Sequence, residues 1–315
     1  MSASRHALVA PAAARIRHWV LSAFPRGQSG IDYDHPPGDP GLFGPDSVTW
    51  RIHGDFPGML SGGLCALMLQ TLHPLALAGV WDHSNFREDL VGRLRRTTNF
   101  VAGTTYAGCA QAQRLIARVA AIHARVRGRS ADGRAYDAAD PRLLTWVHVT
   151  ESYGFLHGFR RYCHDPLPSE VIDAYYAEVR RVAEALGARD VPGSASAVED
   201  YFAGIRTELA FDARSREVLA VLSRIRLPVP ASGLSRELFV GAGAALLPPW
   251  AEAMLGRSAL QRAQARLSAR ALRAIAPLFR VALDDGVAQR ACRRVGADPS
   301  LLRRWPSGFG DGVRR

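Results

Sequence analysis

The chain has 315 residues, with 40 basic and 29 acidic side chains and a formal net charge of +11. Its hydrophobic fraction of 48% is enough to build a sizeable core, which excludes a mostly disordered chain, a collagen-like chain and a coiled-coil rod. No run of about 18 apolar residues is free of charges, so we expect no membrane-spanning helix. The N-terminus has no secretory-signal pattern, which favours a cytoplasmic protein.

The basic residues point away from nucleic acid. All of them are arginine and they are scattered along the chain, whereas a nucleic-acid site concentrates its charge on one element. Arginine without lysine, together with abundant alanine, glycine and proline, is typical of a GC-rich genome. The four cysteines are widely spaced, with no CxxC or CxxCH motif, so we expect no zinc ribbon, disulfide scaffold or c-type haem attachment.

The N-terminal region is predicted to be largely irregular. Residues 1–25 resemble a short helix, and residues 26–57 are interrupted by proline and glycine. Within that stretch, residues 48–53 are the run that suggests a short strand. We divide the chain into an N-terminal segment over 1–39, a helical domain over 40–290 and a loose C-terminal tail over 291–315.

The rest of the chain reads as helical. Residues 60–80 are strongly apolar, with a kink expected at Pro74, and Gly128 is expected to end a helix that begins at residue 110. Asp140 and Pro141 are a typical start for the next helix. With no alternation of strands and helices, the predicted class is all-α, as a single domain. The expected helices cover residues 60–80, 86–101, 110–127, 141–163, 168–187, 197–211, 213–225, 234–247, 249–272 and 277–291.

Histidines on apolar helices are the most distinctive chemical feature. The chain has no P-loop, no dinucleotide-binding glycine motif, no GxSxG and no HExxH. His123 falls in an apolar helical stripe formed by Leu115, Ile116, Val119 and Ile122. A buried imidazole there is either a core histidine bonded to the backbone or an axial ligand to haem iron.

Two further pairs of polar residues share helical faces. Arg93 and Thr97 lie four residues apart, where they would orient dioxygen or meet a haem propionate, or where Arg93 simply covers its neighbours. His148 and Glu151 lie three apart, so that the carboxylate can orient the histidine. A di-iron bundle would need Glu-x-x-His on two helices, and that pattern is missing.

Several ordered segments resemble the MpaB-type oxygenase family, which includes the latex clearing proteins. The resemblance spans roughly residues 40–280. The segments that carry it are SVTWRIHGD (47–55), LQTLHPLALAGV (69–80), DHSNF (82–86), GRLRRT (92–97), IHARVRG (122–128) and LTWVH (144–148).

This resemblance implies a globin-like helical core that holds one non-covalent haem b. It implies His123 as the iron ligand, with His148 as the alternative, and Arg93 and Thr97 as the Arg-x-x-x-Thr motif, with Arg96 as the basic residue before the threonine. The resemblance therefore predicts an oxygenase that uses dioxygen, a hydrophobic substrate and an electron donor as a further partner.

One departure from the family pattern concerns the substrate. Latex clearing proteins carry an acidic residue upstream of the arginine motif, but the corresponding stretch near Leu77 has none. Asp82 and His83 are the nearest candidates, so we expect an unsaturated apolar substrate other than rubber, with His83 as the base. The alternatives are a non-catalytic haem sensor or carrier and a helical binding module without metal.

Overall fold

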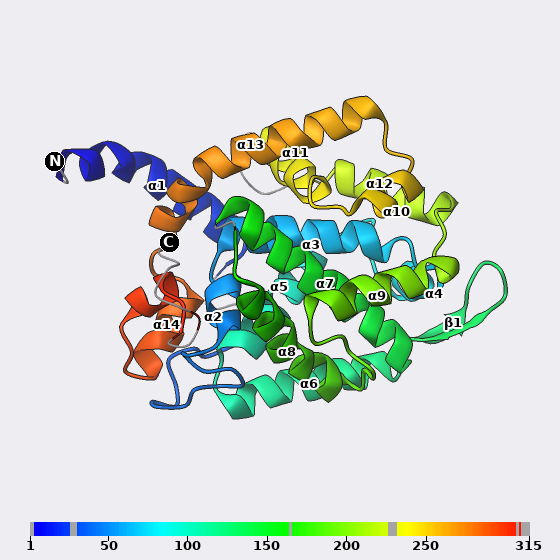
Figure 1. The fold of residues 1–315 in the computed structure, drawn as a ribbon, viewed down its shortest axis with the longest axis horizontal. Coiled ribbons are helices and arrows are strands. Elements are labelled where there is room, and N and C mark those ends of the chain that lie inside the picture. The colour runs from blue at the N-terminus through cyan, green and yellow to red at the C-terminus, as the bar shows by residue number, and fades with distance from the viewer. Residues whose placement is uncertain (1–2, 26–29, 164–165, 226–231, 307–308, 310–315) are drawn as a thin grey trace.

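The computed structural model describes residues 3–25, 30–163, 166–225, 232–306 and 309 (Figure 1). Fourteen α-helices account for most of these residues, and the strands among them are one antiparallel hairpin, β1 (Arg127–Arg129) with β2 (Ala135–Asp137). The predicted all-α class is therefore confirmed, and the hairpin, which pairs Gly128 with Tyr136, is an addition that the sequence did not suggest.

Two helices at the centre of the molecule are in direct backbone contact. They are α3 (Phe56–Gln70) and α7 (Pro141–Tyr162), and each presents two glycines four residues apart to the other. A methyl group on Gly62 would overlap the carbonyl oxygen of Gly154, and one on Gly158 would overlap that of Gly58. Since no side chain fits between them, the two helices pack as close as helices can.

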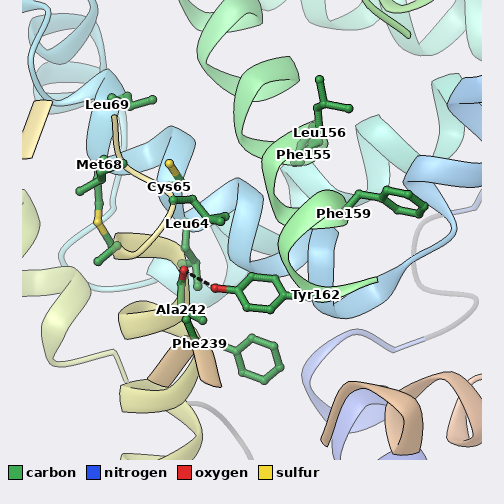
Figure 2. Close-up of a cluster of buried hydrophobic side chains, with 14 of the residues drawn as sticks. Leu64, Cys65, Met68, Leu69, Phe155, Leu156, Phe159, Tyr162, Phe239 and Ala242 are labelled. Atoms are coloured by element: carbon green, nitrogen blue, oxygen red, sulfur yellow. Dashed lines mark hydrogen bonds between the residues drawn. The ribbon is translucent and has the colours of Figure 1, made fainter. Parts of the chain in front are cut away.

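Large apolar side chains surround this contact (Figure 2). Leu64 and Leu69 extend from α3, and Leu156 and Phe159 extend from α7, all buried. The Tyr162 hydroxyl at the end of α7 donates a hydrogen bond of 2.7 Å to the carbonyl of Ala242 in α11 (Ser232–Ala244). The core thus joins α3, α7 and α11 into one body.

The remaining elements lie on two sides of the α3–α7 pair. On one side α11 packs against α3 and α13 (Ala259–Ala282), and α1 (Ala3–Ala23) runs against α13. On the other side α8 (Ser169–Leu186) packs against α7, α2 (Val48–His53) and α6 (Cys109–His123), and α6 packs against α5 (Leu90–Tyr106). The smaller helices are α4 (Pro74–His83), α9 (Ala195–Ile205), α10 (Ala213–Ser223), α12 (Pro249–Met254) and α14 (Val287–Arg294), with 3-10 turns η1 (Arg206–Glu208) and η2 (Pro299–Arg303).

The expected long helix over residues 60–80 is broken into α3 and α4. His73 caps α4 by accepting a hydrogen bond from the Ala76 amide, and Pro74 occupies the first helical position, where its missing N–H costs nothing. The two helices meet at 105°. Among the described helices, none alone is long and apolar enough to span a membrane, and only this bent pair reaches that length and apolarity together.

Residues 48–53 form helix α2, so the strand expected there is wrong. Ser47 caps the helix by accepting a hydrogen bond from the Trp50 amide. The carboxylate of Glu178, in α8, accepts further bonds of 3.0 and 2.8 Å from the amides of Val48 and Thr49. A partner more than a hundred residues away therefore satisfies the start of this short helix, which local sequence could not show.

The C-terminal residues that were expected to form a loose tail are partly helical. The second half of α14 and the turn η2 lie between residues 291 and 303. Arg294 is buried, and its guanidinium donates hydrogen bonds of 3.0 Å to the carbonyl of Tyr33 and 2.7 Å to that of Asp39. These bonds tie the segment to the irregular N-terminal loop. The last residues of the predicted tail, 307–308 and 310–315, lie outside the described part.

Candidate functional site

A pocket enclosed by α2, α5, α7 and α8 gathers several titratable side chains, and we call it the histidine pocket. Its polar lining includes His53 from α2 and His148 and Glu151 from α7. The whole lining comprises Phe43, His53, Phe100, Val101, Thr104, Thr105, His148, Glu151, Ser152, Phe155, Tyr175, Val179 and Val182. Apolar walls with a few convergent polar groups are typical of a ligand site.

Both ring nitrogens of His53 are engaged by neighbours. Nδ1 lies 2.9 Å from the Thr105 hydroxyl and Nε2 lies 3.0 Å from the Tyr175 hydroxyl. Burial lowers the pKa of His53 to about 3, and the nearby His148 lowers it further. The ring is therefore neutral at physiological pH, and each nitrogen has a protein partner.

His148 and Glu151 lie one turn apart on α7 and have fewer partners. His148 makes no hydrogen bond to another described residue, and burial lowers its pKa to about 4. Burial raises the pKa of Glu151 to about 7, against a smaller opposing effect from the charge of Arg93. Glu151 is thus the group in this pocket that exchanges a proton near neutral pH.

Arg93 approaches this pocket from α5. The helix begins at Asp89, whose carboxylate accepts a hydrogen bond of 2.7 Å from the Gly92 amide, and this cap directs Arg93 inward. Arg93 Nη1 donates to the Ser84 hydroxyl at 3.0 Å, and burial lowers its pKa. Its charge acts on Glu151, so the structure brings together two residues that the sequence analysis treated separately.

Arg96 and Thr97 of the same motif lie at the surface. The Arg96 side chain is 62% exposed and forms an ion pair of 3.5 Å with Asp89. Thr97, one turn after Arg93, is also exposed. Of these three residues, the motif therefore places Arg93 among buried groups and leaves Arg96 and Thr97 facing solvent.

His123 is the last residue of α6, which ends four residues earlier than predicted. Its Nδ1 is buried without a hydrogen-bond partner in the described structure, and burial lowers the pKa of the ring. Of the predicted apolar stripe, Ile116 is buried, but Ile122 is 45% exposed. His123 thus has a buried, unsatisfied nitrogen, which is uncommon and calls for an explanation.

The hairpin of α5 and α6 relates His123 to Arg93. Only Ala107 and Gly108 connect the two helices, and Gly103 packs against Leu115. The end of α6 that carries His123 therefore returns toward the beginning of α5, where Arg93 lies. His123 is not among the residues that line the histidine pocket.

His83 lies apart from the histidine pocket, at the end of α4. Its Nε2 is 3.1 Å from the Tyr136 hydroxyl and 3.2 Å from the carbonyl of Arg127, both in the β-hairpin. Tyr136 in turn donates a bond of 2.6 Å to Asp82, and burial and this carboxylate raise its pKa to about 12. Asp82 and His83, the two residues proposed as the base, therefore belong to a partly exposed cluster that connects the hairpin to α4.

His53, Thr105 and Tyr175 form a hydrogen-bonded group in the pocket to which the sequence analysis gave no role. His53 was part of a segment that resembled the family, but the expected strand hid its orientation. Tyr175 is fully buried on α8, where only its hydrogen bond to His53 distinguishes it from an ordinary core tyrosine. A buried tyrosine needs a partner for its hydroxyl, and that requirement was the available signal.

The described residues contain no group of three or more histidine, cysteine or carboxylate side chains that could together hold a metal ion. A site that binds metal through protein ligands alone is therefore not formed within this part of the chain. A single histidine with an unsatisfied nitrogen is instead compatible with a metal that arrives in an organic cofactor.

Comparison with known proteins gives one match. The family model described as ER-bound oxygenase mpaB/B'/Rubber oxygenase, catalytic domain, matches residues 50–281. No curated protein and no solved structure matches the chain. The matched region contains α3 to α12 and nearly all of α13, including every histidine-pocket residue except Phe43. The match supports an enzyme of the oxygenase class, and the chain belongs to the mpaB and rubber oxygenase catalytic-domain family.

Proposed function

We propose that this protein is a haem b-dependent oxygenase that acts with dioxygen on a hydrophobic, unsaturated substrate. The observation that carries the proposal is the buried, unpartnered nitrogen of His123, at the end of a helix in an oxygenase-family domain. An imidazole nitrogen without a protein partner is what an axial ligand to haem iron provides. Family membership supports the oxygenase class, and the haem and the substrate are our inference.

The residues present fit a haem. His123 has a buried Nδ1 without a partner among the described residues, and His148 lines the histidine pocket, whereas both nitrogens of His53 are occupied. We assign His123 as the ligand and keep His148 as the alternative. No hydrogen bond from a described residue fixes the His123 ring. A 180° flip exchanges Nδ1 with Cδ2 and Nε2 with Cε1, so the ring can turn to present a nitrogen to a ligand. Arg93 is a buried cation suited to a propionate, and Phe100 and Val101 supply apolar surface.

When bound, haem would supply the iron chemistry that activates dioxygen. The protein would supply the iron ligand, an apolar pocket for the substrate and a group that donates or accepts a proton. The apolar lining excludes water from the substrate. Glu151 holds a proton on its carboxyl oxygen near neutral pH and can release it to or take it from a neighbouring group. We assign this proton role to Glu151 in place of His83, because His83 is bonded to the β-hairpin outside the pocket.

His53 has a positioning role in this proposal. As a neutral ring it connects Thr105 of α5 to Tyr175 of α8 and holds the two helices at a fixed separation across the pocket. The edge of Phe155 packs against its face, with ring centres 5.4 Å apart. Arg93 orients Glu151 by its charge. These contacts let the pocket keep its shape before any ligand binds.

The first test is the visible absorption spectrum of protein purified from haem-supplemented cells. We expect about one haem per chain, loss of most of it in His123→Ala, and retention in His157→Ala. His157 is a matched control because it lies on α7 like His148 but stacks on Tyr153, with ring centres 4.0 Å apart, and does not line the pocket. A wild-type protein that folds and binds no haem would refute the proposal.

The second test is oxygen consumption by the reduced, haem-loaded protein in the presence of short isoprenoids, unsaturated fatty acids and polyisoprene. Carbonyl or hydroperoxide products from one of the first two classes would support the proposal. Full haem loading without oxidation of any of these compounds would favour the sensor or carrier alternative instead.

A further inference from the structure

A second cavity shares no lining residue with the histidine pocket, and we call it the apolar cavity. It is lined by residues of α1, α3, α5, α11 and α13 and by Ile225, has a volume of about 70 Å³, and is partly open to solvent. Its walls are mainly aromatic and aliphatic, from Trp19 and Phe24 of α1, Phe56 and Leu64 of α3, Phe239 of α11 and Phe279 of α13. None of these residues lines the histidine pocket.

The aromatic rings of this cavity support each other and leave the interior without polar groups. Phe56 stacks on Phe279 with ring centres 5.9 Å apart and meets the edge of Phe24 at 6.1 Å. Apart from the indole of Trp19, the polar side chains in the described lining are those of Ser235 and Arg236. A cavity of this composition holds apolar ligands better than it holds water.

Arg236 places a positive charge at the edge of this apolar lining. Its side chain is only 24% exposed, and its guanidinium donates a hydrogen bond of 3.3 Å to Glu237, the next residue, which is 70% exposed. A guanidinium that is three-quarters buried against apolar walls, and paired with a solvated carboxylate, can accept an anionic group from a ligand at small cost.

The end of α1 that covers the cavity is fixed in place. Arg95 of α5 donates hydrogen bonds to the carbonyls of Ser22 and Ala23, at the C-terminal end of α1. Arg17 donates to the carbonyl of Ala282 at 3.4 Å, at the end of α13. The cover is therefore held at two points, and Trp19 and Val20, which lie between them, face the cavity.

We propose that the apolar cavity binds a single-chain amphiphile with an anionic head, such as a fatty-acid anion. The hydrocarbon chain lies among the side chains of α1, α3, α11 and α13, and the head group pairs with Arg236. Charge complementarity selects an anion over a neutral or cationic head. This inference goes beyond the oxygenase proposal, because it requires neither haem nor turnover.

The test is calorimetric titration of the full-length protein with dodecanoate, dodecanol and dodecyltrimethylammonium, below their micelle-forming concentrations. We expect dodecanoate to bind with one site per chain and the cationic chain to bind least. Arg236→Gln should weaken dodecanoate about tenfold or more, as loss of a charged hydrogen bond implies, and leave dodecanol nearly unchanged. Equal weakening of both ligands would contradict the assignment of the head group.

Filling variants test the position of the chain. Val240→Trp on α11 places a large side chain in the cavity and should abolish binding, whereas Leu234→Trp on the same helix is the control, because Leu234 is 71% exposed. If dodecanoate binds Val240→Trp as tightly as it binds the wild type, the cavity is not the site.

A third measurement does not depend on whether the filled variant folds. A brominated dodecanoate should quench tryptophan fluorescence, and Trp19→Phe should remove this quenching while Trp305→Phe preserves it, since Trp305 packs against Phe159 outside the cavity. Quenching that is unaffected by Trp19→Phe would overturn the proposal, and so would the absence of dodecanoate binding to the wild type.

Discussion

The two cavities differ in the polar groups that they bury. The histidine pocket contains His53, His148 and Glu151. Burial lowers the pKa of the two histidines and raises that of Glu151, which favours the neutral form of each. The apolar cavity is formed by side chains that need no partners, with Arg236 at its edge. Residues of the same hydrophobic core line both cavities. The apolar cavity therefore shows that this core can enclose space without burying the titratable groups found in the histidine pocket.

This difference indicates that the histidine pocket carries out chemistry and that the apolar cavity only binds a ligand. A buried ionisable group reduces folding stability unless its partners compensate, so retention of several in one pocket marks a site with a function. An apolar cavity adds no such cost, and its shape alone selects a ligand. We therefore assign proton transfer to the histidine pocket, and binding of an apolar chain to the apolar cavity.

The α3–α7 contact carries residues of both cavities, since α7 lines the histidine pocket and α3 lines the apolar cavity, and its disruption should have the largest effect. In Gly62→Ala the added methyl group would overlap the backbone of Gly154, which cannot move without shifting α7. We expect the free energy of unfolding to fall by about 2 kcal/mol or more, measured by chemical denaturation.

Gly63→Ala is the matched control for that experiment. A methyl group on Gly63 would lie 3.6 Å from the ring of Phe155, an ordinary contact, and alanine favours the helix by about 0.5–1 kcal/mol over glycine. We expect this variant to be as stable as the wild type or more so. If Gly62→Ala and Gly63→Ala have the same free energy of unfolding, the backbone contact between α3 and α7 does not determine stability in the way we expect.

The raised pKa of Glu151 in the histidine pocket predicts how the folding stability of the protein depends on pH. Its pKa rises from 4.5 to about 7 on folding, so the folded protein binds the proton more tightly than the unfolded chain. This contribution to stability is complete below pH 4.5 and is lost as the pH rises through about 7. In Glu151→Gln it is absent, and the difference between the two proteins should change by about 3 kcal/mol across this window.

The comparison of the two proteins isolates Glu151 from the other charged groups nearby. Groups that do not interact with Glu151 contribute equally to both proteins and cancel in the difference, which retains the coupling between Glu151 and Arg93. Unfolding free energies measured at a series of pH values give the curve directly. Parallel curves for the wild type and Glu151→Gln would mean that this carboxyl has an ordinary pKa and does not hold the proton that we assign to it.

The sequence predicted the elements that rest on local signals. Asp140 and Pro141 begin α7 as expected, with the Asp140 carboxylate accepting a hydrogen bond of 2.8 Å from the Arg142 amide. The glycines at 58 and 62 and at 154 and 158 had a visible four-residue spacing, but its meaning depends on which helix lies opposite.

The candidate site was harder to predict because its partners are far apart in the sequence. His53 was misplaced on a strand, since the helix that carries it is held by Glu178. Glu151 was seen as a neighbour of His148, but its burial and its electrostatic coupling to Arg93 depend on how α5 packs. The position of His123 in an apolar stripe was visible, whereas the missing partner of its Nδ1 belongs to the folded structure.

The smallest predicted effect distinguishes Arg93 from Arg96 in the Arg-x-x-x-Thr motif. Arg93 is buried and its charge lowers the pKa of Glu151, so Arg93→Gln should make the Glu151 carboxyl lose its proton at a higher pH. Arg96 is 62% exposed and is paired with Asp89 at the surface, where solvent screens its charge, so Arg96→Gln should leave that titration unchanged. The infrared band of the protonated carboxyl, assigned through its absence in Glu151→Gln, reports the titration in each variant. A shift in Arg96→Gln as large as that in Arg93→Gln would show that the exposed arginine reaches the pocket, and the separation between a buried polar site and a solvated surface on α5 would then not hold.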